Sequence, residues 1–297
     1  MTADRFGPST SGEFTAVSAA RPLPGETDQP ADAGQPARGG PRPSRSRDWR
    51  PKPPPQHGAW AFLAVPVLVG MAVAGWSPVA WLFLVAFLCA YPVGYYGGRA
   101  LTTRVRRGSW TRLARRERDR ALPWAVLLAA FGIPLVVVRP WLLLVALGLA
   151  VLWVAGLAVA ARQGERSLAN DLVLICQAVV GVPITVAIVA GPGAVTGTLA
   201  AATWTATALV GGYLIGSVLH VKSLLREAGN VGMRRVDVGW HAALAGAGAV
   251  ANPWWLVGFG PALLRAVVAH PGGKPLVIGV IEAVVAVLVV VAAVLAT

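Results

Sequence analysis

The sequence predicts an all-α protein, a polytopic bundle of about nine transmembrane helices. Of its 297 residues, 56% are hydrophobic and only 13% are charged, against roughly 25% charged residues in a typical soluble domain. The hydrophobic residues form long runs, and basic connections alternate along the chain with connections that carry almost no charge. A soluble fold gains nothing from such runs, whereas a helix surrounded by lipid must be apolar on its outside.

Nine apolar runs define the predicted spans, and most approach the 17–25 residues that a spanning helix needs. The run 237–251 is short, so a re-entrant pair formed with 253–269 would leave about seven or eight crossings. The spacing between Pro66 and Pro183 recurs between two tyrosines, which suggests two four-helix halves followed by a ninth helix. The runs are 59–75, 78–98, 121–138, 140–161, 172–190, 195–216, 237–251, 253–269 and 275–296.

Residues 1–57 are predicted to form a disordered, basic tail, which leaves 58–297 as the membrane domain. The tail is rich in Pro, Gly, Ser and Arg, and it has too few apolar residues to offset the entropy of ordering the chain. It lacks the apolar core of a signal peptide. The stretch Arg38–Lys52 carries six basic residues against one acid, Asp48. Beside the first span, we expect it to lie on anionic headgroups.

The basic connections predict the orientation. Positively charged loops stay in the cytoplasm, so we expect a cytoplasmic N-terminus, an outer C-terminus and a location in the cell (inner) membrane. The net charge of +13 is explained by these loops and by contact with anionic lipid, and no nucleic-acid partner is expected. The basic connections are 99–120, 162–170, 217–236 and 270–274, and the alternate ones, 76–77, 139, 191–194 and 252, carry only Arg139.

Polar side chains gather at the predicted inner ends of the spans. An ionisable group within a membrane segment is a functional candidate, and all of these residues fall in the cytoplasmic half. They predict a polar cavity, open to the cytoplasm, that binds a small anionic or lipid-linked ligand. The candidates are His57, Asn170, Asp171, Gln177, Lys222, Arg226, Glu227, His241 and Glu282.

Each candidate also has a structural interpretation. Asn170 or Asp171 would cap a helix, and Lys222 and Arg226 would be ordinary inner-loop charges. His241 lies four residues after Asp237 and would form a local pair with it. Glu282 is hardest to explain in this way, because an unpaired carboxylate in hydrocarbon costs several kcal/mol. A partner such as His241 or Lys222 would offset that cost.

The connection 99–120 holds nine arginines together with Glu117 and Asp119. Leu101, Val105 and Leu113 recur in it at helical spacing, which predicts an amphipathic helix lying on the inner membrane surface. A phosphate-bearing ligand is the alternative partner of these guanidinium groups. The two cysteines, Cys89 and Cys176, form no CxxC pair, so we expect neither a disulfide nor a metal site. The sequence identifies no catalytic residue and no cofactor.

Three motifs resemble the YwiC-like family of bacterial membrane proteins. They are Pro-Gln-His-Gly-Ala-Trp at 55–60 with Pro66 and Gly70, Glu-Arg-Ser-Leu-Ala-Asn-Asp at 165–171, and Val-Lys-Ser-Leu-Leu-Arg-Glu at 221–227. The resemblance extends from residue 53 to about residue 296. It implies membrane-embedded relatives, and it supplies no mechanism.

The architecture also looks like the UbiA-type membrane prenyltransferases, which have nine helices and long inner loops after the second and sixth. Those enzymes hold a prenyl diphosphate through magnesium on Asp-rich motifs. Here the loop 99–120 has arginines instead, the loop 217–236 offers only Glu227, and Asn170-Asp171 lacks a second aspartate. The resemblance therefore implies the fold, a degenerate site and an isoprenoid or other small ligand. A transporter, with Pro66, Pro92 and Pro183 marking broken helices, and a membrane scaffold without a site are the alternatives.

Overall fold

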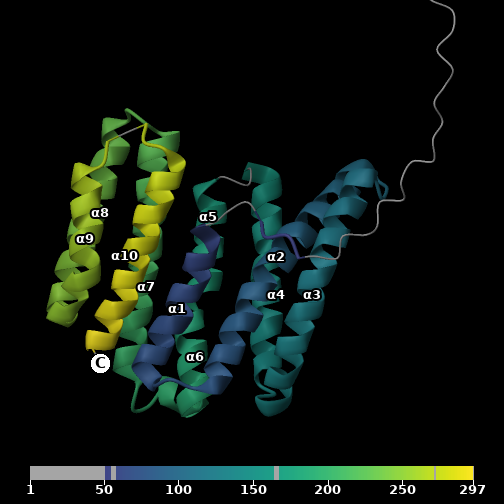
Figure 1. Cartoon of the computed structure of the whole chain (residues 1–297), viewed down its shortest axis with the longest axis horizontal. Helices are drawn as coiled ribbons and strands as arrows, with labels where there is room; N and C mark the ends of the chain where they lie inside the picture. The colour runs from purple at the N-terminus through teal and green to yellow at the C-terminus, as the bar shows by residue number, and fades with distance from the viewer. Residues whose placement is uncertain (1–50, 55–57, 164–166, 271, 297) are drawn as a thin grey trace, which may run out of the picture. The chain divides into compact units, whose positions relative to one another are not determined.

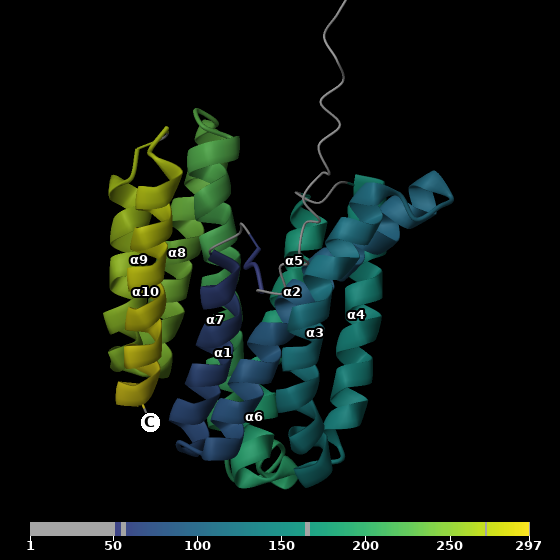
Figure 2. The same ribbon diagram turned by 45° about the vertical axis from the view of Figure 1, so that its right-hand side comes forward.

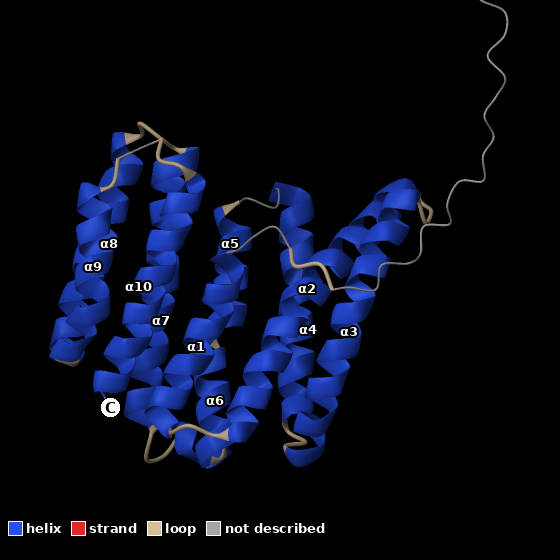
Figure 3. Ribbon diagram, in the orientation of Figure 1, coloured by secondary structure: helices blue, strands red, loops and turns tan. Residues whose placement is uncertain are grey.

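The structure is a computed structural model that describes residues 51–54, 58–163, 167–270 and 272–296. Helices account for all the regular structure in these residues (Figure 3). All of these residues belong to one compact unit. Short helical turns connect some of the helices: η1 (Pro192–Val195), the π-helical turn η2 (Lys222–Arg226) and η3 (Pro253–Trp255). The α-helices are α1 (Gly58–Ala74), α2 (Pro78–Arg107), α3 (Arg112–Val138), α4 (Leu142–Gln163), α5 (Leu168–Val179), α6 (Gly181–Ala190), α7 (Ala200–Val221), α8 (Val231–Ala251), α9 (Leu256–Val268) and α10 (Pro275–Ala296).

The described helices make nine passes, because α5 and α6 form one continuous stretch, Leu168–Ala190 (Figure 1). Six stretches are long and apolar enough to cross a membrane by length and composition, and α1 and Pro253–Val268 are shorter apolar helices. The remaining pass, α8, carries Arg234, Arg235 and Asp237 in its first two turns. Within the described ranges, the prediction of an all-α bundle of about nine transmembrane helices is confirmed.

Two predicted connections are helical instead. The prediction of one separate helix in the stretch 99–120 is wrong, because α2 continues to Arg107 and α3 begins at Arg112. Arginine is a good helix former, so nothing ends α2 before Gly108, which has the left-handed φ of 66°. The side chain of Thr111 then caps α3 by accepting a hydrogen bond from the amide of Ala114.

The α8 pass is a complete helix. Asn230 caps it by accepting a hydrogen bond from the amide of Met233 at 3.1 Å, so α8 begins at Val231, six residues before the predicted span. The chain then turns through η3 into α9, a separate helix of 13 residues. Sequence hydropathy missed the first turn and a half of α8 because Arg234 and Arg235 interrupt its apolar side chains.

Two hydrophobic cores share α1 and α6. One contains residues of α1, α5, α6, α7, α8, α9 and α10, and the other residues of α1, α2, α3, α4 and α6. Gly70 of α1 allows the close crossing: a Cβ added there would lie 2.6 Å from the Thr185 Cβ and 2.8 Å from the Val182 carbonyl oxygen. Gly181 faces Pro66 in the same way, at 3.2 Å. Small residues therefore bring α1 and α6 into backbone contact, as expected for membrane helices.

A short described segment, 51–54, is fixed against α2 and α3 before the chain enters α1. The Lys52 carbonyl accepts hydrogen bonds from the Tyr96 hydroxyl at 3.1 Å and from Trp124 Nε1 at 3.0 Å. Trp60 packs on Tyr91 and Trp124 nearby. Apart from residues 51–54, the predicted disordered tail lies outside the described residues, and so does His57.

Candidate functional site

Buried or nearly buried polar side chains from α7, η2, α8, α9 and α10 meet toward one end of the bundle, the end that also carries the turn between α2 and α3 (Figures 1 and 2). We call them the α7–α10 polar cluster. Burial of so many polar groups requires that they satisfy one another. The members are Ser217, His220, Ser223, Asp237, His241, Arg265 and Glu282.

Asp237 is the centre of the cluster, and its side chain is fully buried. One carboxylate oxygen, Oδ2, lies 2.9 Å from His220 Nδ1 and accepts a hydrogen bond from the Ser223 hydroxyl at 2.8 Å. The other, Oδ1, lies 3.1 Å from His241 Nδ1. His241 Nδ1 also lies 2.8 Å from the backbone carbonyl oxygen of Asp237, which is its hydrogen-bond acceptor. Because carboxylate and carbonyl oxygens only accept hydrogen bonds, Nδ1 carries the proton in both imidazoles.

The cluster continues through His241 to α9 and α10. His241 Nε2 lies 3.5 Å from Arg265 Nη2. Arg265 forms an ion pair with Glu282 of α10, and Glu282 accepts a hydrogen bond from the Ser217 hydroxyl. The backbone carbonyl of Glu282 accepts another from the Tyr213 hydroxyl at 3.4 Å. Four helices are therefore joined by one chain of polar contacts.

The charges within the α7–α10 polar cluster are balanced. Arg265 is opposite Glu282, and Arg234 Nη1 lies 3.5 Å from Asp237 Oδ2. With neutral imidazoles, two cations face two carboxylates. Such balance reduces the cost of burying four charges. Arg265 Nε is buried and has neither an ion-pair nor a hydrogen-bond partner among the described residues.

A second group of charges joins α5 to the end of α7. Lys222 Nζ lies 3.0 Å and Arg226 Nη1 3.9 Å from the same oxygen of Asp171, Oδ2. Both cations belong to the π-helical turn η2, a geometry that is frequent at functional sites. The same turn contains Ser223, the neighbour of Lys222, whose hydroxyl donates a hydrogen bond to Asp237. It therefore links both groups of charges.

The structure thus brings the sequence-predicted residues together in two sets. Lys222 and Arg226 meet Asp171, whereas His241 and Glu282 belong to the α7–α10 polar cluster. The suggested partner of Glu282, His241 or Lys222, is wrong as a direct contact, because Arg265 and Ser217 occupy that place.

The remaining candidates lie apart from these contacts. The residue that caps α5 is Ser167, whose hydroxyl accepts a hydrogen bond from the amide of Asn170. Neither Asn170 nor Asp171 is the cap. Asn170 is buried and has an interaction partner. Gln177 has a buried Nε2 without a hydrogen-bond partner among the described residues. Glu227 is exposed and accepts only a local hydrogen bond, from Asn230 Nδ2.

The candidates predicted from the sequence did not include five members of the cluster: Ser217, His220, Ser223, Asp237 and Arg265. A signal for Arg265 was present, since it is the one charged residue in the predicted span 253–269, and a charge inside a span marks a functional candidate. The two serines gave no such signal, because serine is common in membrane helices. Within the described ranges, no group of three or more His, Cys, Asp or Glu side chains is placed to hold a metal ion.

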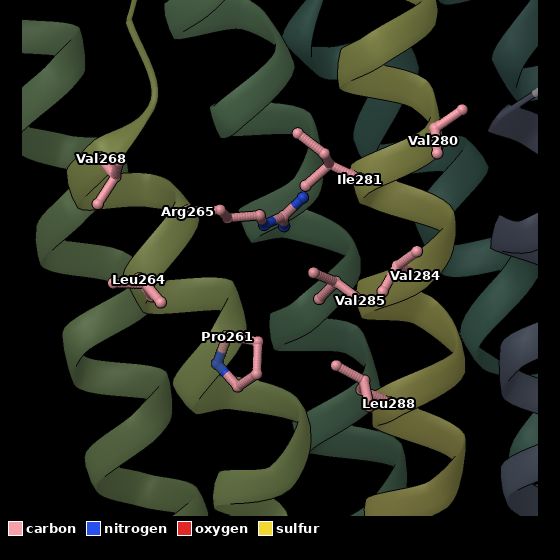
Figure 4. A pocket seen from close by; sticks show the side chains of 9 residues that line it. All are labelled: Pro261, Leu264, Arg265, Val268, Val280, Ile281, Val284, Val285 and Leu288. Atoms are coloured by element: carbon pink, nitrogen blue, oxygen red, sulfur yellow. The ribbon is translucent and has the colours of Figure 1, made fainter.

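An apolar groove of about 400 Å³ runs between α9 and α10 beside the cluster. Arg265 extends from α9 toward α10 among its apolar side chains (Figure 4). Several of these, such as Leu264 and Val284, are more than half exposed, so the groove opens away from the bundle. It is lined by Pro261, Leu264, Arg265, Val268, Val280, Ile281, Val284, Val285 and Leu288.

Comparison with known proteins finds similarity to one family. Residues 54–186 match the family described as YwiC-like protein. The chain is also 29% identical over 249 residues to "Uncharacterized protein YwiC" of Bacillus subtilis (strain 168), an alignment that covers 77% of this chain and 91% of the relative. These matches show that the chain is similar to YwiC-like proteins.

The YwiC-like match includes α1–α4 and most of the α5–α6 pass, so it ends before the α7–α10 polar cluster. The longer alignment with the Bacillus relative extends the similarity over most of the chain. No solved structure matches the chain, and the likeness to UbiA-type prenyltransferases stays a prediction. The name of the relative states no activity, so function must be argued from the geometry.

Proposed function

We propose that this YwiC-like membrane protein binds an anionic, lipid-linked ligand, with the chain of the ligand in the α9–α10 groove and its charged group at Arg265. The observation that supports this proposal is that Arg265 both lines the groove and belongs to the polar cluster. An amphiphile needs both features together, an apolar channel and a cation at one point along it.

The chemistry of Arg265 fits an anionic group. A guanidinium carries five N–H donors in a planar fork that matches carboxylate and phosphate oxygens. Glu282 and His241 engage the two terminal nitrogens, and Nε is unpartnered among the described residues. A ligand oxygen would complete this fork, and isoprenoid and acyl chains both fit the apolar lining.

The placement of the polar residues favours binding over transport. The described contacts run from Arg234 near the start of α8 to Tyr213 within α7, and all lie toward the end of the bundle that carries the α2–α3 turn. A transporter needs a polar path through the whole membrane thickness. The cluster supports a site entered from one side.

The orientation is part of the proposal: the arginine-rich end faces the cytoplasm, the C-terminus faces outward, and the bundle lies in the cell membrane. In a chain with Cys89 and Cys176 replaced by alanine, Ser109→Cys would test the α2–α3 turn and Thr196→Cys the opposite end. A membrane-impermeant maleimide should label Thr196→Cys in intact cells. It should label Ser109→Cys only after permeabilisation, and labelling of both positions from outside would contradict the orientation.

Ligand binding is tested by purifying the full chain in native lipid nanodiscs and identifying the retained amphiphile by mass spectrometry. We expect an anionic isoprenoid or acyl compound in near-stoichiometric amount. Val284→Trp, which fills the groove, should lower its recovery about tenfold, the equivalent of ~1.4 kcal/mol. Val287→Trp is the matched control, because Val287 is an exposed residue of the same helix outside the groove lining.

The charged part of the site has its own test. The double variant Arg265→Met/Glu282→Met removes both charges and keeps the groove. It should fold and yet lose the anionic compound. Equal recovery from wild type, Val284→Trp and the double variant would rule out this site.

A further inference from the structure

The ends of α2 and α3 form a basic helical hairpin, Arg99–Arg120, which has no role in the proposed ligand site. It consists of the last turns of α2, the turn 108–111 and the first turns of α3. It carries nine arginines and two acids. We call it the arginine hairpin.

Both acids of the arginine hairpin are already paired. Glu117 is buried and accepts from Arg120 at 3.0 Å, and Asp119 contacts Arg118 at 3.0 Å. Other arginines stack on an aromatic ring: the Arg104 guanidinium lies 4.8 Å from the centre of Trp110. A further set is exposed and makes no ion pair among the described residues: Arg106, Arg107, Arg112 and Arg116. The hairpin therefore presents positive charge that nothing in the described chain neutralises.

The helices of the arginine hairpin are longer than a membrane crossing needs, and their basic ends are tilted. At about 1.5 Å per residue, the 30 residues of α2 span roughly 45 Å, against roughly 30 Å for the hydrocarbon core. Pro92 and Pro123 each remove one backbone hydrogen bond below the basic ends, which allows both helices to bend. In Figure 2 these ends run obliquely to α4 and α5. In a bilayer, such a lean would keep the arginines closer to the headgroups than an upright hairpin would.

Apolar side chains lie exposed among the arginines. Val105 is 73% exposed, and Leu101 and Leu113 are also exposed. In a hairpin surrounded by water, these apolar side chains would be hydrated, which is unfavourable. The combination of basic and apolar side chains is typical of helices that bind at the bilayer interface.

We infer that the arginine hairpin binds the surface of an anionic phospholipid bilayer, with Arg106, Arg107, Arg112 and Arg116 on the phosphates and Val105 at the level of the interface. Bidentate guanidinium–phosphate contacts supply the attraction, which acts only within about a Debye length, roughly 10 Å at 0.1 M salt. This inference does not depend on the ligand site between α9 and α10.

The test places an environment-sensitive fluorophore on Val105→Cys in the full chain lacking Cys89 and Cys176. In nanodiscs that contain phosphatidylglycerol, the emission should be brighter and blue-shifted relative to nanodiscs of phosphatidylcholine alone. The difference should vanish at about 1 M salt, where the Debye length is about 3 Å. It should also vanish in the variant Arg106→Gln/Arg107→Gln/Arg112→Gln/Arg116→Gln, whose changed residues are exposed and do not support the fold.

The same fluorophore on Val250→Cys is the control, because Val250 is 90% exposed near the other end of α8. Its emission should not respond to the four substitutions. Emission from position 105 that is equal in both lipids would overturn the inference and leave the hairpin facing a soluble acidic partner. A shift that survives the four substitutions would overturn it too, because the arginines would then not be the cause.

Discussion

Replacement of Asp237 by alanine is expected to destabilise the protein by about 3–5 kcal/mol, the usual cost of removing one partner from a buried charge network. The carboxylate is fully buried and receives His220, His241 and Ser223. Its removal leaves His220 Nδ1 and the Ser223 hydroxyl without this acceptor and Arg234 without its counter-charge, whereas His241 Nδ1 keeps the backbone carbonyl of Asp237. Unfolding in detergent, followed by helical circular dichroism against added dodecyl sulfate, measures the loss.

Two further variants give this result its meaning. Asp237→Asn keeps the shape and one acceptor oxygen, so it should cost less than alanine. Asp119→Ala removes an exposed carboxylate from a surface pair, and it should change the free energy of unfolding by less than about 1 kcal/mol. If Asp237→Ala were as stable as Asp119→Ala, the cluster would not hold α7 and α8 together.

The Arg265–Glu282 pair should show strong energetic coupling. Each side chain is less than one-seventh exposed, so Arg265→Met or Glu282→Met alone leaves an uncompensated buried charge and should cost about 3–5 kcal/mol. The double variant removes both charges, and methionine fills similar volumes. It should be more stable than either single variant, as measured by a double-mutant cycle.

Additive losses in that cycle would contradict the pairing of the two side chains. The cycle also separates folding from binding. A double variant that regains stability but not the amphiphile would show that the charges serve the ligand, whereas one that regains both would assign them to the fold alone.

Hydropathy predicted the passes well and their ends poorly. The apolar runs of the fourth and last passes match α4 and α10 to within two residues. At α2, α3 and α8 the helices extend well into charged sequence, because arginine favours a helix as readily as leucine does and only a cap or a left-handed glycine stops it. Hydropathy predicts which part of a helix can face lipid, and it does not predict the residue at which the helix ends.

The candidate site was predictable only where its contacts are local. The pair Asp237–His241 follows from a spacing of four residues on one helix, and the structure has that contact. The contacts of His220 with Asp237 and of Arg265 with Glu282 join different helices. No periodicity predicts them, because they depend on how the helices rotate and pair.

The sequence by itself determined that this chain is a helical membrane protein, because lipid-facing residues must be apolar and this requirement appears directly in the composition and in the order of the residues. Only the tertiary structure decided that Asp171 pairs with Lys222 and Arg226, that Arg265 joins Glu282 at the edge of an apolar groove, and that the arginines leave the bundle as a hairpin. The reason is that burial demands a partner for every charge, and several inner residues could have met that demand. The packing of small residues such as Gly70 sets which helices approach, and therefore which charges meet.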